Sequence, residues 1–168
     1  MRLRAQTVIQ IIGCISLATL LGGCAGSPVQ IWSMNTSQLD EVNIADLCNA
    51  YAVSKQSNED IRAALKRRDD LLVELITAGK PDPFTGNTAR SPFTSEEWEA
   101  IEARTVFLGM SEFALICSWG YPIPFGGGAI NESVGSWGTK RQYVYRRGSY
   151  SKPQYVYVEN GKVTSWQN

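Results

Sequence analysis

The residue pair that comes nearest to a catalytic motif is Ser149 with Lys152, which have the spacing Ser-x-x-Lys. In serine acyl-enzymes this spacing puts a lysine one helical turn from the attacking serine, and the motifs S-D-N and K-T-G complete the site. Here the pair falls in a predicted loop between strands, and neither partner motif occurs. We therefore expect no acyl-enzyme chemistry at Ser149.

Other catalytic and metal-binding groups are scarce. The 168 residues include no histidine, which excludes Ser-His and Cys-His catalysis and histidine-ligated metals. The acidic residues between 96 and 102 fall in the polar first turns of a predicted helix, whereas a glycosidase acid would need burial. The glycines at 126–128 lack the lysine and the strand-to-helix context of a phosphate-binding loop, and they predict a flexible turn. We expect a protein without enzymatic activity, metal or cofactor.

The first 25 residues predict a bacterial lipoprotein signal. Arg2 and Arg4 form a basic head, and residues 5–23 carry no charge and have an apolar centre. As a membrane-spanning helix the stretch is marginal, because such a helix needs about 20 mostly apolar residues. It ends in Leu-Leu-Gly-Gly-Cys-Ala at 20–25, which resembles a lipobox whose Cys24 receives acyl chains such as palmitate. The alternative is an ordinary thiol just beyond an ordinary signal peptide.

The lipobox resemblance implies cleavage before Cys24 and attachment of the mature chain to a membrane by its acyl chains. A second partial match ends at Cys14, but too few residues precede it for a complete signal. Ala25 rather than aspartate follows Cys24, which by analogy with enterobacterial sorting favours the outer membrane. We expect a signal peptide over 1–23, a short tether over 24–37 and a domain that faces the periplasm.

Two further cysteines, Cys48 and Cys117, remain in the mature chain. An even pair in an exported protein is a disulfide candidate because the compartment is oxidising. Each cysteine falls on a different predicted helix, so the bond would join the two helices. The alternative is a pair of small, reduced, buried residues.

Charge is balanced over the whole chain, with 16 basic and 16 acidic residues, so nothing favours a nucleic acid partner. It is unbalanced locally. Residues 38–112 contain 14 acidic and 8 basic residues, and residues 113–168 contain 2 acidic and 6 basic residues. The two parts could attract each other within one domain, or they could present surfaces to different partners.

Hydrophobic periodicity predicts helices first and strands afterwards, so the fold class is α+β. The helices are expected over 38–53, 58–77, 95–106 and 112–119. Ser57 is expected to cap the second of them, a capping box at Thr94–Glu97 to begin the third, and Ser111 to cap the fourth.

The strands are expected at the C-terminal end of the chain, over 141–147, 154–159 and 162–166. Asn160-Gly161 between the last two is a strong signal for a tight hairpin turn. Regular pairing across that turn sets Tyr155 opposite Trp166, and alternation along the strands then separates two faces. One face carries five aromatic residues: Tyr143, Tyr145, Tyr155, Tyr157 and Trp166. The other carries Val144, Val156, Val158 and Val163. We favour the valines inside, which would display the rings beside Arg141 and Arg147; the opposite orientation stays open.

The C-terminal part resembles a known family. The sequence has Gly-Met-Ser at 109–111, a short predicted helix, Trp-Gly-Tyr-Pro at 119–122 and Asn-Gly-Lys-Val-Thr at 160–164. This pattern resembles the SmpA/OmlA-like (BamE-like) small lipoproteins over about residues 108–167. The resemblance implies a short helix packed on a three-stranded antiparallel sheet over 108–168. The part over 38–107, predicted to be helical, has no counterpart there.

Together these features predict a lipid-anchored, non-enzymatic binding protein of the bacterial envelope. We expect its partner to be an envelope protein, in an outer-membrane assembly or maintenance role. The expected contact residues are Tyr143, Tyr145, Tyr155, Tyr157 and Trp166, with Arg146 and Arg147 at the rim. Two alternatives stay open: an inhibitor or immunity-type lipoprotein, and a binder of anionic glycans or lipid headgroups.

Overall fold

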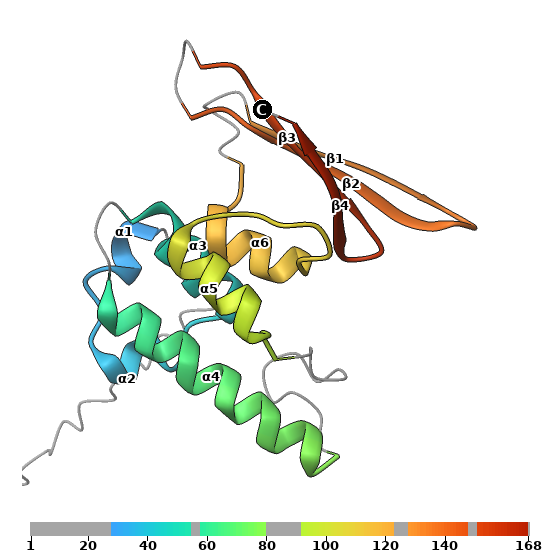
Figure 1. Cartoon of the computed structure of the whole chain (residues 1–168). Helices are drawn as coiled ribbons and strands as arrows, with labels where there is room; N and C mark the ends of the chain where they lie inside the picture. Colours follow the sequence, from blue (N-terminus) through green and yellow to red (C-terminus); the bar gives the residue numbers. More distant parts are fainter. Residues whose placement is uncertain (1–27, 55–57, 80–91, 123–127, 148–150, 168) are drawn as a thin grey trace, which may run out of the picture.

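The computed structural model describes residues 28–54, 58–79, 92–122, 128–147 and 151–167. Cys24 and the predicted signal peptide lie outside these residues, as do the glycines at 126–128 and Ser149. The chain is α+β: helices come first and a C-terminal antiparallel sheet follows (Figure 1). The predicted fold class is therefore confirmed. The sheet has four strands rather than three.

The helices begin with two short ones, α1 (Pro28–Ile31) and α2 (Thr36–Leu39). Both lie in or next to the segment expected to be a tether. That expectation is wrong for residues 28–37, because Ile31 is 1% exposed and Trp32 Nε1 donates to the carbonyl of Ala50 at 2.9 Å. Burial of an apolar side chain and a hydrogen bond to α3 (Ile44–Val53) hold this segment on the domain.

The helix predicted over 38–53 is interrupted. α2 ends at Leu39, and α3 begins again at Ile44, where the side chain of Asn43 accepts a hydrogen bond from Ala45 N. Arg68 stabilises the turn between them by donating to the carbonyl of Val42 at 2.9 Å. The apolar periodicity continues through this turn, which is why the sequence analysis predicted one helix despite the capping residue Asn43.

The remaining helices agree closely with their signals. α4 (Glu59–Thr77) is capped by Asn58, one residue after the expected Ser57. α5 (Ser95–Ala103) has the predicted capping box, in which the Thr94 side chain accepts from Glu97 N and the Glu97 side chain accepts from Thr94 N. α6 (Glu112–Trp119) begins at the predicted cap, Ser111.

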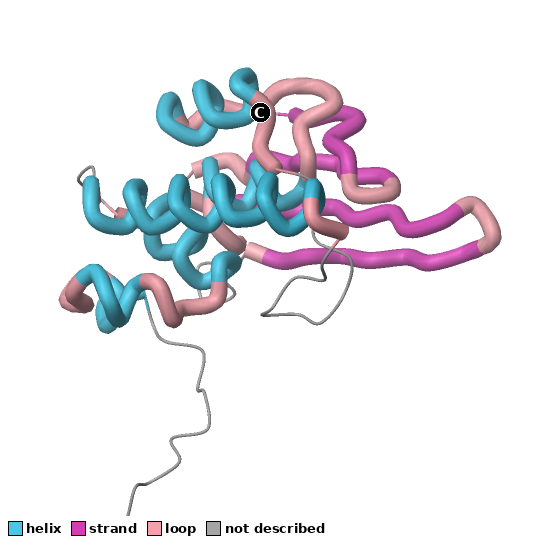
Figure 2. The backbone as a smooth tube through the Cα atoms, turned by 90° about the horizontal axis from the view of Figure 1, so that it is seen from below, coloured by secondary structure: helices cyan, strands magenta, loops and turns pink. Residues whose placement is uncertain are grey.

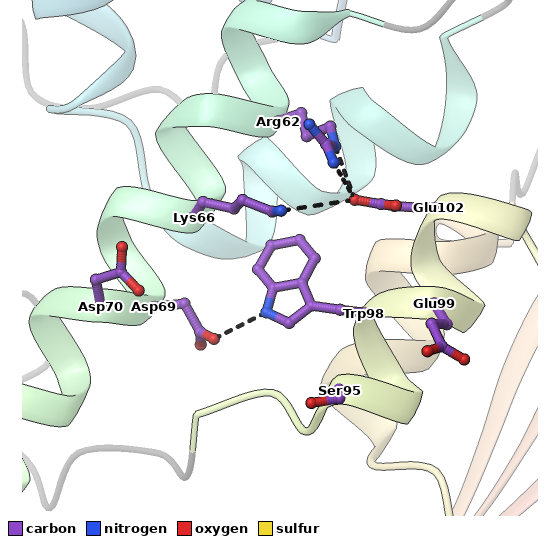
Figure 3. A pocket seen from close by; sticks show the side chains of 8 residues that line it. All are labelled: Arg62, Lys66, Asp69, Asp70, Ser95, Trp98, Glu99 and Glu102. Atoms are coloured by element: carbon purple, nitrogen blue, oxygen red, sulfur yellow. Dashed lines mark hydrogen bonds and ion pairs between the residues drawn. The ribbon is translucent and has the colours of Figure 1, made fainter.

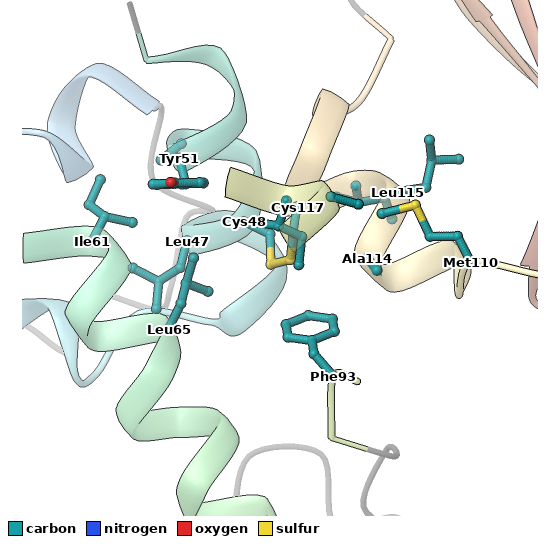
Figure 4. Packing of buried hydrophobic residues seen from close by; sticks show 14 of the residues in the cluster. Leu47, Cys48, Tyr51, Ile61, Leu65, Phe93, Met110, Ala114, Leu115 and Cys117 are labelled. Atoms are coloured by element: carbon teal, nitrogen blue, oxygen red, sulfur yellow. A yellow bond between two sulfur atoms is a disulfide. The ribbon is translucent and has the colours of Figure 1, made fainter. Parts of the chain in front are cut away.

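A disulfide joins α3 to α6 through Cys48 and Cys117, as the sequence predicts, with Cα atoms 4.1 Å apart. Figure 4 shows it at the centre of the helical core, with Phe93 close by. Both cysteines are fully buried. The same cluster contains buried side chains from four helices and from the sheet: Leu47, Leu65, Ile101, Leu115, Val156 and Val158.

The sheet has the order β1-β2-β3-β4, with every neighbouring pair antiparallel. Its strands are β1 (Ala129–Gly135), β2 (Gly138–Tyr145), β3 (Gln154–Glu159) and β4 (Lys162–Gln167). Asn160 and Gly161 both have positive φ, as a tight turn of the predicted kind requires. β1 is the strand that the sequence analysis missed.

The helices all lie on one side of the sheet, which leaves two unlike sheet faces (Figure 1). α6 is the helix next to the sheet. The chain before it is bonded to β4, since Val163 N donates to the carbonyl of Met110 and Gly109 N to the carbonyl of Val163, each at 2.8 Å. The hairpin of β1 and β2 extends past the helices (Figures 1 and 2).

Candidate protein-binding surface

Register decides which side chains share a face, because residues directly opposite one another in a sheet point the same way. Tyr143 lies opposite Val156, and Val144 lies opposite Tyr155. The prediction that five aromatic rings share one face is therefore wrong. Tyr143 lies on the helix-facing side with Val156, and Tyr155 lies on the outward side.

Tyr143 and Tyr145 are core residues rather than contact residues, being 3% and 5% exposed. The Tyr143 hydroxyl donates to a carboxylate oxygen of Glu112, and the Tyr145 hydroxyl donates to the carbonyl of Gly120 at 3.0 Å. Burial raises the pKa of Tyr143, and the Glu112 carboxylate raises it further. Burial likewise raises the pKa of Tyr145. A buried tyrosine needs a partner for its hydroxyl; here the first residue of α6 and the residue that caps its C-terminus are the two acceptors.

Trp166 is also on the helix-facing side, contrary to prediction. A bulge near Tyr157 and Val158 shifts the register, so Trp166 lies opposite Val156 rather than Tyr155. One extra residue in a strand reverses the facing of every side chain beyond it. Trp166 nevertheless stays 39% exposed, because it lies on the edge strand β4.

The outward face keeps two of the predicted aromatic residues, Tyr155 and Tyr157, both half-buried. A hydrogen-bonded row crosses it: Asn131 Nδ2 donates to Gln142 Oε1 at 2.9 Å, and Gln142 Nε2 donates to the Tyr157 hydroxyl at 3.0 Å. A shallow depression of about 220 Å³ lies over this row. The row holds Tyr157 in a fixed orientation, so its ring is presented without a large entropy cost of ordering.

The predicted rim arginines are both exposed. The Arg147 guanidinium lies 4.7 Å from the centre of the Trp119 ring, and its Nε donates to Gln154 Oε1 at 3.1 Å. Arg147 is thus bound to the end of α6 and faces the helices. Arg146 follows β2, which ends at Tyr145, and its side chain is exposed.

The hairpin of β1 and β2 contributes apolar residues that the sequence analysis did not select. Ile130, Val134 and Trp137 are 43%, 70% and 50% exposed. The available signal was the pair Gly135 and Gly138, which flank a two-residue turn. Exposed apolar side chains on a projecting hairpin are typical of a contact site.

Three cations of the described sheet strands form ion pairs with carboxylates. Lys140 Nζ lies 2.9 Å from Glu159, Arg141 bonds both Glu112 and Glu132, and Lys162 Nζ lies 3.9 Å from Glu97. Two of these pairs join the acidic helical part to the basic sheet, so the charges attract within one domain. These three cations already have carboxylate partners, which would compete with an anionic ligand for them.

A second hollow, of about 360 Å³, lies between α4 and α5 (Figure 3). Trp98 Nε1 donates to Asp69 at 3.1 Å, Phe93 N donates to the same carboxylate, and the Lys66 ammonium lies 5.5 Å from the centre of the Trp98 ring. Glu102 accepts from Arg62. The contacts of Trp98 with Asp69 and Lys66, and of Glu102 with Arg62, link α4 to α5. They are the polar contacts of two packed helices.

No family model, curated protein or solved structure matches this chain. The resemblance to the SmpA/OmlA-like lipoproteins therefore rests on the residues quoted for it. Within the described ranges, no helix combines the length and apolar composition needed to cross a bilayer. The same residues contain no group of three or more carboxylates or cysteines placed to hold a metal ion.

Proposed function

We propose that this chain is a lipid-anchored, non-enzymatic protein-binding module of the bacterial envelope. The acyl chains on Cys24 hold it at the periplasmic side of the outer membrane, and the C-terminal sheet contacts another envelope protein. The sequence at 20–25 supports the anchor. The SmpA/OmlA-like pattern supports a place in outer-membrane assembly or maintenance.

The observation that carries the proposal is the two-sided sheet. Its helix-facing side is filled by Tyr143, Val156 and Val158, while its outward side has no helix of the described chain against it (Figure 1). That side presents Tyr155 and Tyr157, ordered by Gln142, beside a projecting hairpin. Aromatic side chains held in place are typical of residues that dominate binding energy at protein interfaces.

Site-specific photocrosslinking in intact cells tests the contact. A photoreactive amino acid in place of Tyr157 should yield one discrete protein adduct, identified by mass spectrometry. The same amino acid in place of Val73, which is 50% exposed on α4, is the control and should not yield that adduct. Purified partner should then bind wild type and lose affinity for Tyr155→Ala. The proposal is overturned if Tyr157 yields no protein adduct while Val73 does.

The anchor is tested separately by mass spectrometry of the native N-terminus. We expect an acylated cysteine at position 24 and loss of labelling by an alkyne-tagged palmitate in Cys24→Ala. Cys14→Ala is the matched control and should keep the label, because Cys14 leaves with the signal peptide. An unmodified N-terminal Cys24 would contradict the anchoring.

A further inference from the structure

The feature that carries a further inference is the outer edge of β1. β1 is the first strand in the sheet order, and all seven of its residues are exposed. An edge strand has a row of main-chain N–H and C=O groups without a neighbouring strand. At the opposite edge, β4 is bonded near its start to residues 109–111. β1 extends past the helices (Figures 1 and 2), and no strand of the described residues pairs with its outer edge.

The direction of these main-chain groups follows from one hydrogen bond. Asn160 N donates to the carbonyl of Thr139 at 2.8 Å, so the main-chain groups of Thr139 point toward β3. Such groups alternate along a strand, so those of the even-numbered β2 residues point toward β1. Their partners on β1 are the odd-numbered residues, such as Ser133 opposite Lys140. The main-chain groups that point out of the sheet belong to Ile130, Glu132 and Val134.

The side chains of these three residues give the edge a definite pattern. Glu132 lies opposite Arg141 and bonds it, with Ile130 and Val134 two positions away on the same face. Arg141 also bonds Glu112, at 2.7 Å, so a single guanidinium serves two carboxylates. Glu132 therefore shares its ion-pair partner with Glu112, and the three groups together carry a net charge of −1.

A second copy of β1 fits this edge poorly. Antiparallel self-pairing that sets Ile130 opposite Val134 also sets Glu132 opposite Glu132 of the other copy. Like charges directly opposite one another destabilise a strand pair. A register shifted by two residues sets Glu132 of one copy opposite an apolar residue of the other copy. A larger shift leaves Glu132 outside the paired residues. A charge on an edge strand is a known obstacle to self-association, and it selects for a strand of opposite charge.

We propose that β1 is a strand-addition site for a partner protein, which adds an extended antiparallel segment with a basic residue opposite Glu132. The residues two positions to either side of that basic residue are apolar and pack against Ile130 and Val134. Main-chain bonds to the three outward-pointing residues provide affinity, and the charge provides register. The inference rests on the proposed function in that it assumes the sheet binds a protein.

The test uses the full-length chain in detergent and a fluorescent peptide that has lysine at its centre, valine two positions to either side, and serine or threonine between. A second peptide has glutamate at the centre. We expect saturable binding of the lysine peptide, at least about tenfold tighter than the glutamate peptide. Glu132→Lys should reverse the preference. On binding, the amides of Ile130, Glu132 and Val134 should become protected from hydrogen exchange, and the amide of Ser133 should not change.

Proline at an outward-pointing position removes an edge N–H but leaves the bonds between β1 and β2 intact. Val134→Pro should therefore weaken the lysine peptide about tenfold, and Val134→Thr, which keeps the N–H, should stay near wild type. If Val134→Pro does not fold, the Glu132→Lys reversal decides the matter alone. Equal binding of both peptides, or protection of Ser133 instead, would overturn the proposal.

Sedimentation separates a second copy from a foreign strand. A dimer of the full chain that dissociates in Val134→Pro would overturn the inference in favour of self-pairing. A Tyr157 photocrosslink without any peptide binding at β1 would leave the proposed function standing and remove strand addition. If neither the Tyr157 photocrosslink nor peptide binding at β1 is observed, both the proposed function and strand addition are wrong.

Discussion

Arg141 of β2 and Glu112 of α6 form an ion pair that connects the sheet to the helices, with Arg141 Nη1 2.7 Å from Glu112 Oε2. Glu112 also accepts a hydrogen bond from the Tyr143 hydroxyl, and its side chain is only 15% exposed. Main-chain N–H groups at the start of α6 add to the favourable field around this carboxylate. Glu112, the first residue of α6, therefore holds the side chains of Arg141 and Tyr143 in β2.

Removal of this carboxylate should destabilise the domain. We expect Glu112→Ala to lower the free energy of unfolding by about 2 kcal/mol, because the buried Tyr143 hydroxyl loses its acceptor and Arg141 loses one of its two carboxylate partners. Glu159→Ala is the matched control. It removes the exposed pair with Lys140 and should cost no more than about 0.5 kcal/mol. Urea denaturation of both variants measures the difference, and equal losses would contradict the role given to Glu112.

The buried tyrosines predict a fall in stability at high pH. An unfolded tyrosine ionises near pH 10, and burial raises the pKa of Tyr143 and Tyr145 in the folded chain. Their contribution is therefore complete below about pH 10 and is lost as the pH rises above it. Tyr143→Phe should make this loss shallower, because it removes one of the two buried hydroxyls. Denaturation at a series of pH values measures the loss of stability, and tyrosinate absorbance follows the ionisation of the tyrosines. A free energy of unfolding that stays constant above about pH 10 would contradict this prediction.

The disulfide should supply a large share of the stability. It closes a segment with a sequence separation of 69 residues, and the chain-entropy estimate for such a loop is about 4 kcal/mol. We expect the double variant Cys48→Ala, Cys117→Ala to lose an amount of that order. Wild type under reducing conditions should lose a similar amount, whereas the double variant should not respond to reductant. A double variant as stable as wild type would show that the bond is dispensable.

Gly138 should tolerate a side chain poorly. Its φ is +103°, and a Cβ there would collide with Asn160 Oδ1, which accepts a hydrogen bond from Thr139 N. We expect Gly138→Ala to lower the free energy of unfolding by about 2 kcal/mol. Gly79 also has positive φ but open space around it, so Gly79→Ala should cost about 1 kcal/mol. Thermal unfolding compares the two, and a smaller loss at Gly138 would contradict the crowding.

Local signals in the sequence were sufficient for most helix ends and for the last hairpin. Thr94 with Glu97, and Ser111, determine where α5 and α6 begin, because a cap needs only residues within one turn. Asn160-Gly161 determines the β3–β4 turn because few residues other than these adopt positive φ. The pair Cys48 and Cys117 was predictable because the predicted export signal implies an oxidising compartment, which favours pairing of the two cysteines that remain.

The sequence did not determine the candidate surface. Alternation of residues along one strand shows which of its side chains share a face. Which face of β2 lies on the same side of the sheet as a given face of β3 depends on the register between the two strands. That register is set by the packing of Tyr143 and Tyr145 under α6, through contacts with Glu112 and Gly120 that are distant in sequence.

The bulge in the β3–β4 pair places Trp166 on the helix-facing side of the sheet. Side chains along a strand alternate between the two faces, so one added residue puts every later side chain on the opposite face. β1 was missed because its residues are all exposed, so no buried face gives the strand a hydrophobic pattern. Local chemistry thus determined where the chain bends and caps. Only the tertiary packing decided which rings are buried and which strands form the edges of the sheet, because burial and pairing depend on partners that no short window of sequence contains.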